Sequence, residues 1–383
     1  MSIDIEYVPK IFSKKVIKQI KNANTRIIIC TLYIQNDIFG NRLLNELNNR
    51  AIIKPNVSID IFIDGLSNVN WITKKYKNIK ITKIKLNKYL PFKVFHAKGW
   101  IIDDLLIYSG VNINNSYFHQ VNTFRQDRYF FIKNKKICDI YHNMLLNTTH
   151  AFILNNHLSC NIIYQSLIED DSLDFKVNPF FGFGKENIQS KIFFDLCKSA
   201  KKHLFLSTPY FNPDNKTIEI INSLITKKVV IEIVIGINNG NKKNYNERLK
   251  CNYLVNNFYL ERLVNFMDLF KNEIGKTIFI YHWKDLNNSY HVKNLLVDNR
   301  ISLLTSSNFN IRSHQLDCEN GFIIEAISEN ARNRLVMEKE FILNNSIKMH
   351  STSYAHSLMS GAYQHLIRFL KKIRLYTKII KLI

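Results

Sequence analysis

The sequence predicts an α/β fold of two pseudosymmetric lobes, each a mixed β-sheet flanked by helices. Three observations carry this prediction. Apolar, strand-like runs alternate with helical runs along the chain. The second half repeats the order of segments found in the first half. The length of 383 residues, with 46% hydrophobic residues, is sufficient for two ordinary domains with sizeable cores.

The repeat can be followed segment by segment. Each half has a predicted helix, a buried strand that runs into a polar loop, an alternating strand, a third strand, and a fourth that ends in a Ser/Asn-rich turn. The predicted pairs are helices Lys10–Asn24 and Gln189–Lys202, then strands Thr25–Asp37 and His203–Asp214, Val57–Gly65 and Val229–Ile237, Phe95–Asp104 and Tyr290–Asn299, and Ile107–Asn114 and Leu303–Asn310. The second half also contains a predicted helix at Leu254–Asn272. A site at the junction would receive the same motif from each half.

The acidic, polar run Glu169–Asp174 is the predicted boundary between the halves. It gives an N-terminal lobe at 1–170, a C-terminal lobe at 171–362, and a terminal segment at 363–383. That segment holds six Lys and Arg residues and no acid, with apolar residues at helical spacing, among them Leu366, Leu370, Ile373 and Ile380. We expect a basic amphipathic helix that lies on an anionic membrane surface. The alternative is an amphipathic helix docked on the core with a solvated basic face.

Composition narrows the class of protein. The net charge of +22 suits an anionic partner such as lipid, nucleotide or nucleic acid, although lysine enrichment from an AT-rich genome would produce the same excess. We find no apolar run of the roughly 18–20 residues that span a membrane, and no secretion signal. The six cysteines form no CxxC pair, which argues against a zinc site or a disulfide framework. We therefore expect a cytoplasmic protein that associates peripherally with the inner leaflet of the membrane.

Two HxKxxxxD motifs, one in each half, carry the predicted chemistry. They supply His96 and Lys98 from the first half, and His291 and Lys293 from the second. Because alternate residues of a strand share a face, each histidine should lie beside its lysine. Brought together, two imidazoles and two ammonium groups suit a phosphodiester: the lysines stabilise charge, one histidine attacks phosphorus, and the other protonates the leaving oxygen. No metal or other cofactor is expected.

Further polar residues recur at equivalent points of the repeat. Asp127 and Glu319 follow the histidines by 31 and 28 residues, and we assign them the role of holding each imidazole in one tautomer. The motif acids Asp103 and Asp298 lie at an odd offset from the histidines and are predicted to be structural. Candidate donors to phosphate oxygens are Asn112 and Asn308. A single HxKxxxxD match arises by chance, but two matches inside an internal repeat do not.

The paired motifs resemble the phospholipase D superfamily, whose members work through a covalent phosphohistidine. The stretch Phe95–Asn134 resembles more narrowly the bacterial phosphatidylserine synthases of the phospholipase D type, as do Ser207–Asp214, Tyr290–Asn299 and the stretch from Leu304 to Glu319. The resemblance implies two phospholipase D-like lobes. It also implies transfer of the phosphatidyl group from CDP-diacylglycerol to L-serine, with His96 as nucleophile and His291 as acid and base.

The resemblance adds further site residues. The usual Gly-Ser-x-Asn turn of the family is imperfect in both halves, so Asn114 and Asn310 are alternative phosphate donors. Candidate substrate-binding residues come from the YFHQ and QDRY segments, with one of the arginines pairing with the serine carboxylate; they are His119, Arg125, Arg128 and Tyr129. Rival functions are a cardiolipin synthase or phospholipase of the same superfamily, or a metal-independent nuclease. No specific nucleic-acid partner is expected, because the aromatic residues mostly lie in core-like runs.

Overall fold

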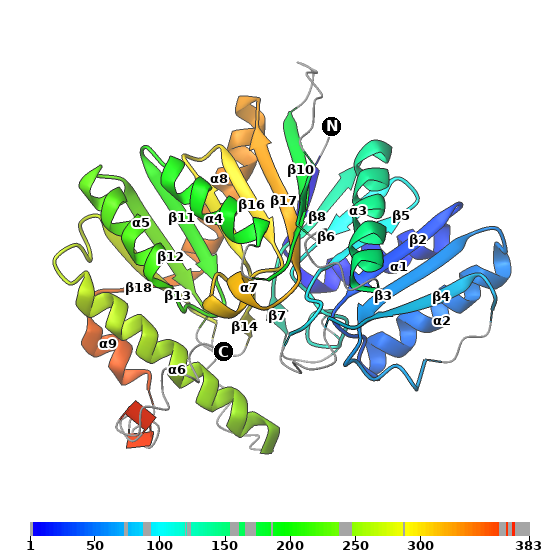
Figure 1. Cartoon of the computed structure of the whole chain (residues 1–383), viewed down its shortest axis with the longest axis horizontal. Coiled ribbons are helices and arrows are strands. Elements are labelled where there is room, and N and C mark those ends of the chain that lie inside the picture. Colours follow the sequence, from blue (N-terminus) through cyan, green and yellow to red (C-terminus); the bar gives the residue numbers. More distant parts are fainter. Residues whose placement is uncertain are drawn as a thin grey trace.

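The predicted two-lobed α/β fold is confirmed by the computed structural model of the chain (Figure 1). The structure describes residues 3–72, 76–86, 93–118, 120, 124–153, 161–164, 174–184, 187–236, 247–285, 288–359, 365–366 and 370–371.

The main elements follow a similar order in both halves. The first half contains β1 (Ile3–Glu6), α1 (Pro9–Asn22), β2 (Arg26–Thr31), α2 (Ile38–Ile53), β3 (Ser58–Asp64), β4 (Ile79–Ile84), β5 (Gly99–Ile102), β6 (Leu105–Tyr108), β7 (Arg125–Gln126), β8 (Tyr129–Lys133) and α3 (Lys135–Ile153). The second half contains β9 (Ile162–Ile163), β10 (Phe175–Gly182), α4 (Ile188–Ser199), β11 (His203–Thr208), α5 (Asn215–Thr226), β12 (Val230–Ile235), α6 (Glu247–Leu269), β13 (Ile278–Trp283), β14 (Ser289–Tyr290), β15 (Asn294–Val297), β16 (Ile301–Thr305), α7 (Ile311–Gln315), β17 (Glu319–Ala326), α8 (Glu329–Asn344), β18 (Ser346–Met349) and α9 (Thr352–Ser357). The differences in order are α6, α7 and the position of the short strands β7 and β14.

The two sheets have the same topology. The first has the order β1-β8-β6-β5-β2-β3-β4, and the second has β10-β17-β16-β15-β11-β12-β13, with β9 and β18 added at its edges. In the first sheet β2, β3 and β4 are parallel to one another, and in the second sheet β11, β12 and β13 are parallel to one another. The remaining pairs are antiparallel. The predicted boundary near residue 170 lies outside the described residues. The strand β9, which precedes it, pairs with β10 of the second sheet.

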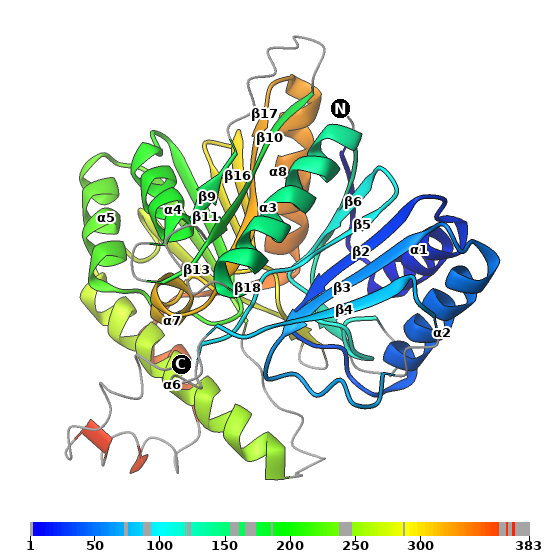
Figure 2. The ribbon, with the colours of Figure 1, turned by 45° about the vertical axis from the view of Figure 1, so that its right-hand side comes forward.

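Alternate residues of each central strand face different layers. In β2, Ile27 and Ile29 pack with the outer helices α1 and α2, whereas Ile28 and Cys30 face the other lobe. The second sheet packs in the same way against the outer helices α4, α5 and α6. Helices α3 and α8 lie between the sheets, in one apolar cluster that takes residues from both lobes (Figures 1 and 2). The lobes therefore share a continuous central core.

A polar loop follows β2 in the first lobe and β11 in the second lobe, and each loop ends where an aspartate caps the next helix. After β2, the Asp37 side chain accepts a hydrogen bond from the Gly40 N–H at 2.9 Å and begins α2. After β11, Asp214 accepts one from the Thr217 N–H at 2.8 Å and begins α5. An N-terminal cap of this kind fixes where the helix starts, so both loops are held at the same edge of their sheets.

The prediction that the two HxK segments lie within strands is wrong. Strand β5 begins at Gly99, after Lys98, and β15 begins at Asn294, after Lys293. The physical reason lies in the hydrogen bonds of the backbone. The N–H of His96 donates to the carbonyl of Cys318 at 2.8 Å, in the opposite lobe, so this extended segment pairs across the molecule and not within its own sheet.

Candidate active site

The two HxK segments meet where the lobes face each other. The His291 N–H donates to the Gln126 carbonyl at 2.8 Å, which mirrors the contact between His96 and Cys318. The short parallel pair of β14 with β7 lies beside it. Each lobe thus fixes the backbone of the other lobe's motif histidine, and the two motifs form one composite site.

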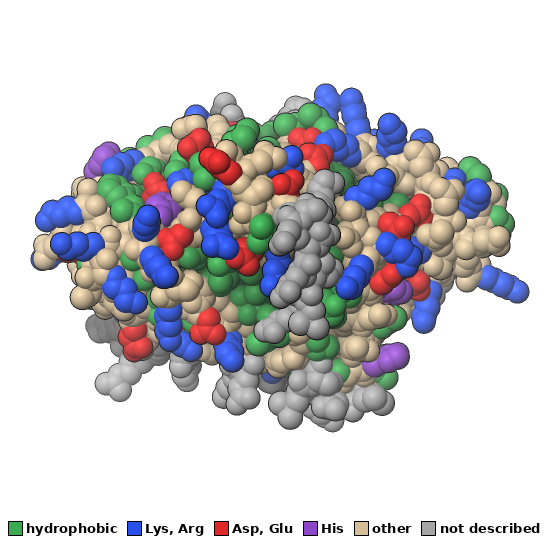
Figure 3. Space-filling model, turned by 90° about the horizontal axis from the view of Figure 1, so that it is seen from above, with side chains coloured by type: hydrophobic (Ala, Val, Ile, Leu, Met, Phe, Trp, Pro, Cys, Tyr) green, Lys and Arg blue, Asp and Glu red, His purple; other side chains and the backbone are tan. Residues whose placement is uncertain are grey.

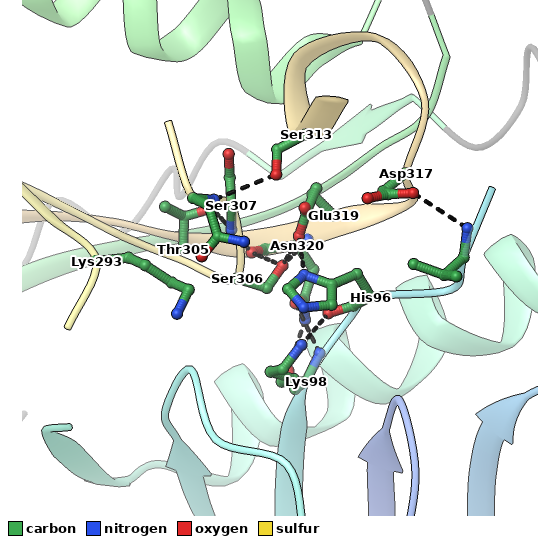
Figure 4. Close-up of polar contacts among 12 residues, drawn as sticks. His96, Lys98, Lys293, Thr305, Ser306, Ser307, Ser313, Asp317, Glu319 and Asn320 are labelled. Carbon is green, nitrogen blue, oxygen red and sulfur yellow. Dashed lines mark hydrogen bonds and ion pairs between the residues drawn. The ribbon is translucent and has the colours of Figure 1, made fainter. Parts of the chain in front are cut away.

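The orienting acids act across the lobes. The Glu319 carboxylate contacts Nδ1 of His96 at 2.9 Å, and the Asp127 carboxylate contacts Nδ1 of His291 at 2.9 Å. Sequence order alone associates each acid with the histidine that precedes it in the same half, whereas the structure exchanges them. In both rings Nδ1 faces a carboxylate, so Nε2 is the nitrogen that can react with substrate. Nε2 of His291 also lies 3.1 Å from Nζ of Lys293. Figure 4 shows the pair formed by His96 and Glu319 together with its neighbours.

The two lysines are buried beside the histidines. Lys98 is 1% exposed and its Nζ donates to the carbonyl of His96 at 2.7 Å. Lys293 is 2% exposed and its Nζ lies 2.9 Å from Nδ1 and 2.8 Å from the carbonyl of His291. Burial lowers the pKa of Lys98 to about 8 and that of Lys293 to about 7. A bound phosphate would restore the charge of both ammonium groups.

Burial and the neighbouring positive charges lower the pKa of both histidines. Burial lowers the pKa of His96 to about 4, opposed by the charge of Glu319. Burial also holds the pKa of His291 well below its usual value, and the charges of Lys293 and Arg125 add to that effect. Both imidazoles are therefore neutral at pH 7, as a nucleophile must be, and His291 gives up a proton more readily than an ordinary histidine.

The two acids differ in their surroundings. Burial alone raises the pKa of Glu319, but His96, Lys98 and a hydrogen bond from the Ser306 hydroxyl outweigh it and hold the pKa below its ordinary value. Burial raises the pKa of Asp127 to about 6, against the charge of Lys293. Gly110 takes the place of Ser306 in the first lobe, and a Cβ there would lie 3.0 Å from Oδ2 of Asp127. The two lobes therefore contribute matching residues to the site, but the pKa values of their two acids are shifted in opposite directions.

The Ser/Asn turns hold four asparagines in two different settings. Asn114 donates to the Tyr33 hydroxyl at 3.0 Å, and Asn310 caps α7 by accepting from the Ser313 N–H at 2.9 Å. Both amides thus stabilise their own turns. Asn112 and Asn308 are partly or fully buried, and the carboxamide oxygen of each lacks a hydrogen-bond partner within the described structure. Each of these oxygens can accept a hydrogen bond from a ligand, whereas the role of Asn112 and Asn308 as donors to phosphate stays a prediction.

The motif acids Asp103 and Asp298 lie in the tight turns β5–β6 and β15–β16, away from the histidines. Both adopt a left-handed backbone conformation, with φ of 52° and 49°. The Asp103 carboxylate accepts from the N–H groups of the loop between α1 and β2, including Thr25 at 2.7 Å. Asp298 does the same in the second lobe, with the Lys202 N–H at 2.8 Å. These contacts support a structural role for both acids.

The candidate substrate-binding residues separate into different settings. The Arg125 guanidinium lies 5.3 Å from the centre of the Tyr117 ring, which packs edge-on against His291. Arg128 is 4% exposed and forms a buried ion pair with Glu338. Tyr129 is fully buried and its hydroxyl donates to the carbonyl of residue 117 at 3.2 Å, which makes it part of the core. His119 lies outside the described residues. Arg125 is thus the arginine placed beside the histidines.

Several residues that shape the site carry no sequence signal of their own. Asp64 accepts from the Phe95 N–H at 2.7 Å, and Asp317 accepts from the Val94 N–H at 3.1 Å. Together they fix the segment that leads into His96. Asn320 was also missed, although it directly follows a predicted acid. Among the residues that the structure describes, no group of three or more His, Cys, Asp or Glu side chains could hold a metal ion.

Comparison with known proteins agrees with this geometry. The family model described as "Cardiolipin synthase, PLD-like domain" matches residues 16–148 and 193–340. The CDP-diacylglycerol–serine O-phosphatidyltransferase of Escherichia coli is 27% identical over 97% of this chain and 92% of its own length. A cardiolipin synthase of Clostridium perfringens is 24% identical over 88% of this chain and 69% of its own. The crystal structure of phosphatidylserine synthase from Haemophilus influenzae superposes with a TM-score of 0.87 at 23% identity, covering 100% of this chain and 95% of that one.

Proposed function

The chain belongs to the family of proteins with phospholipase D-like (PLD-like) domains, and on that premise we propose that it is a CDP-diacylglycerol–serine O-phosphatidyltransferase. The observation that carries the choice of substrates is the likeness to the E. coli enzyme of that name over 97% of this chain. The chemistry rests on the composite site, where two neutral imidazoles lie beside two buried lysines. The product is phosphatidylserine, with CMP released.

The reaction follows from the asymmetry of the site. Nε2 of His96, whose ring is held by ionised Glu319, attacks the phosphorus that bears diacylglycerol. The bond from phosphorus to the CMP oxygen breaks and its electron pair leaves with CMP. The anionic phosphate of the bound substrate favours the protonated form of His291, and the Nε2–H of this imidazolium supplies the proton. Lys98 and Lys293 stabilise charge on the non-bridging oxygens. The serine hydroxyl then gives its proton to His291 and attacks phosphorus, which breaks the bond to His96.

Trapping the covalent intermediate tests this route. The full-length chain is incubated with labelled CDP-diacylglycerol, and CMP release is measured with and without serine. We expect serine-dependent release by the wild type, a trapped phosphatidyl-enzyme in His291→Ala, and none in His96→Ala. Trapping only in His96→Ala would reverse the two roles. Release that depends on phosphatidylglycerol instead of serine would favour a cardiolipin synthase, and cutting of plasmid DNA without metal would favour a nuclease.

Arg125 is the proposed partner of the serine carboxylate. Its guanidinium lies beside Tyr117 and contributes to the field at His291, which receives the serine proton. A planar guanidinium binds a carboxylate through two parallel hydrogen bonds, which lysine cannot copy. We expect Arg125→Lys to raise the KM for serine about tenfold and to leave the KM for CDP-diacylglycerol within about twofold. Equal increases in both KM values would show that Arg125 does not bind serine specifically.

The terminal segment 363–383 is the proposed contact with an anionic membrane. Most of it lies outside the described residues, but Leu370 is buried in the cluster of the outer helices and Lys371 pairs with Glu261 of α6. These contacts agree with the docked alternative at Leu370 and Lys371, and the proposal of membrane contact rests on the other basic residues of the segment, which would attract anionic headgroups. On the face seen in Figure 3, by contrast, basic side chains are scattered among acidic ones. None of the described helices is both long and apolar enough to cross a bilayer.

Charge removal separates this contact from folding. In the test variant, Lys372, Arg374, Lys378 and Lys381 are replaced by glutamine, which leaves Leu370 and Lys371 in place. We expect sedimentation with phosphatidylglycerol vesicles to fall by about tenfold or more at low salt, while activity in detergent micelles stays within about twofold. Unchanged sedimentation would contradict the proposal.

A further inference from the structure

The residue after each orienting acid also crosses between the lobes. Arg128, which follows Asp127, donates from Nη2 to the backbone carbonyl of Lys293 at 2.7 Å. Asn320, which follows Glu319, donates from Nδ2 to the backbone carbonyl of Lys98 at 2.7 Å. Two different side chains thus make the same contact at equivalent points of the repeat, each with the lysine of the opposite lobe.

Each of these side chains also bonds to a helix of the central layer. Arg128 forms its ion pair with Glu338 of α8. Asn320 donates to the Tyr141 hydroxyl of α3 at 2.8 Å, and that hydroxyl in turn donates to the Lys98 carbonyl at 2.6 Å. Helices α3 and α8 follow equivalent strands of the two sheets. Each lysine backbone is therefore connected to the opposite lobe and to the layer that joins the lobes.

Three consecutive residues of one lobe dock the HxK segment of the other. The first accepts from the histidine N–H, the second binds Nδ1 through its carboxylate, and the third binds the lysine carbonyl. These residues are Cys318, Glu319 and Asn320 for the first motif, and Gln126, Asp127 and Arg128 for the second. Figure 4 shows Asn320, Glu319 and Lys98 at the first of these contacts.

The burial of these side chains indicates that they orient the backbone of the two lysines as well as fill the core. Asn320 is fully buried and Arg128 and Glu338 are 4% and 1% exposed. A buried ion pair contributes little net stability compared with apolar side chains of the same volume. It does fix direction, because the guanidinium has a rigid fork of donors. Next to Lys98, Gly99 has φ of +147°, and a Cβ there would lie 2.4 Å from the Tyr141 hydroxyl, so glycine makes room for this contact.

We propose that Arg128 and Asn320 are reciprocal positioning residues, each fixing the backbone of the other lobe's phosphate-binding lysine so that its ammonium group is aimed at the substrate phosphate. The inference rests on the proposed function for its substrate and on the phosphodiester site for its geometry. Loss of either contact leaves a lysine that still exists in the site but is aimed less well. A misplacement of about 1 Å is enough to cost about a hundredfold in rate.

The test compares Arg128→Lys and Asn320→Asp, which alter the donors with little change in volume. We expect kcat to fall by about tenfold to a hundredfold, with the KM for serine within about twofold. Water that reaches the loosened lysine raises the pKa of its ammonium group toward its ordinary value. In Arg128→Lys the alkaline limb of the pH profile of kcat/KM therefore moves to higher pH, which a general loss of stability would not cause. In Asn320→Asp the new carboxylate adds to a shift in the same direction.

Arg334 provides a matched control. Like Arg128, it is an arginine that donates across the lobes to a backbone carbonyl. It lies on α8, and its acceptor is the carbonyl of Ile3 at 2.8 Å. Arg334→Lys should keep kcat within about twofold and leave the alkaline limb in place. If Arg334→Lys loses as much activity as Arg128→Lys, or if Asn320→Asp retains wild-type kcat and pH profile, the proposal is overturned. Asn320→Asp also decides the matter if Arg128→Lys fails to fold.

Binding of inorganic phosphate separates this inference from the proposed function. Calorimetry on the full-length chain at several pH values measures phosphate binding by the two lysines and does not require turnover. We expect Arg128→Lys and Asn320→Asp to weaken phosphate binding by about tenfold and Arg334→Lys to leave it unchanged. If the wild type binds phosphate in this way but releases no CMP from CDP-diacylglycerol, the substrate assignment fails and the positioning role stands. Equal phosphate affinity in all variants overturns the positioning role.

Discussion

At the scale of single residues, the two halves of the site match in their histidines and lysines but differ beside the two acids. Ser306 hydrogen-bonds to Glu319, whereas Gly110 stands at the equivalent position beside Asp127. The hydroxyl favours the charged form of Glu319, and Asp127 lacks this donor, so the pKa values of the two acids move in opposite directions. Two titratable groups with divergent pKa values are typical of an acid and a nucleophile that share a site.

Ser306→Ala tests this difference. Loss of the hydroxyl removes a hydrogen bond to a charged group, which contributes about 1.5–3 kcal/mol, so we expect kcat/KM to fall by about tenfold. The pKa of Glu319 should rise, and because the carboxylate must be ionised to orient His96, the acidic limb of the pH profile should move to higher pH. Ser199→Ala, at the exposed end of α4, is the control. An unmoved acidic limb would show that Ser306 does not set this pKa.

The residue scale is also where sequence predicted most. His96, Lys98, His291, Lys293 and both orienting acids were named from the repeat, and the structure brings all six together. Which acid meets which histidine could not be read from the sequence, because the exchange depends on how the lobes face each other. Asn320 was missed, and Arg128 was named only as a candidate substrate-binding residue, because a contact with a backbone carbonyl of the other lobe cannot be inferred from residue type.

At the scale of elements, the turns between the paired strands carry the motif acids. Asp103 accepts three backbone N–H groups from the loop between α1 and β2, as well as the Thr25 hydroxyl. Burial raises its pKa, but these hydrogen bonds outweigh it and lower the pKa below the ordinary value. The carboxylate thus ties the turn of the β5–β6 hairpin to the start of β2.

Asp103→Asn tests that role. Asparagine tolerates the left-handed backbone conformation but loses the charge, so we expect a loss of about 1–2 kcal/mol in the free energy of unfolding with kcat within about twofold. Since the folded pKa lies below the unfolded one, the contribution of the carboxylate is present above the unfolded pKa and is lost as pH falls through the folded pKa. The difference between variant and wild type, measured by urea unfolding, should therefore shrink in acid. Asp104→Asn, at the exposed neighbour, should change little.

The strands of the repeat were predicted better than the helices of the central layer. The alternating runs gave β3 and β12 within one or two residues. The HxK segments were wrongly placed in strands, because their hydrogen bonds go to the other lobe. Helices α3 and α8 were not predicted. In α3, nine of nineteen residues are buried, and they recur at intervals of three and four, which is the spacing of one helix face and was a signal available in the sequence.

At the scale of the whole molecule, the lobes are joined by a common core. Leu335 of α8 is 1% exposed and belongs to the cluster that also holds Ile28 and Ile101 of the first sheet. The duplicated sequence suggests two independent domains, but apolar contacts that run through both sheets make separate unfolding costly. The catalytic groups lie against this shared layer, so their geometry depends on it.

Thermal unfolding tests the shared core. We expect one transition, detected at the same temperature by calorimetry and by loss of activity. Leu335→Ala in the central layer and Leu47→Ala in the outer layer should each cost about 2–5 kcal/mol and move that single transition as a whole. Two transitions in the wild type, or splitting of the transition by Leu47→Ala, would show that the lobes unfold independently.

The exchange of acids between the lobes has a consequence for how the duplicated chain can change. Each half alone carries a histidine without its carboxylate and a carboxylate without its histidine. A half expressed separately is therefore catalytically silent, and it regains a complete set of groups only on docking to a complementary half. A substitution at the site in one repeat therefore acts on a group that the other repeat supplies.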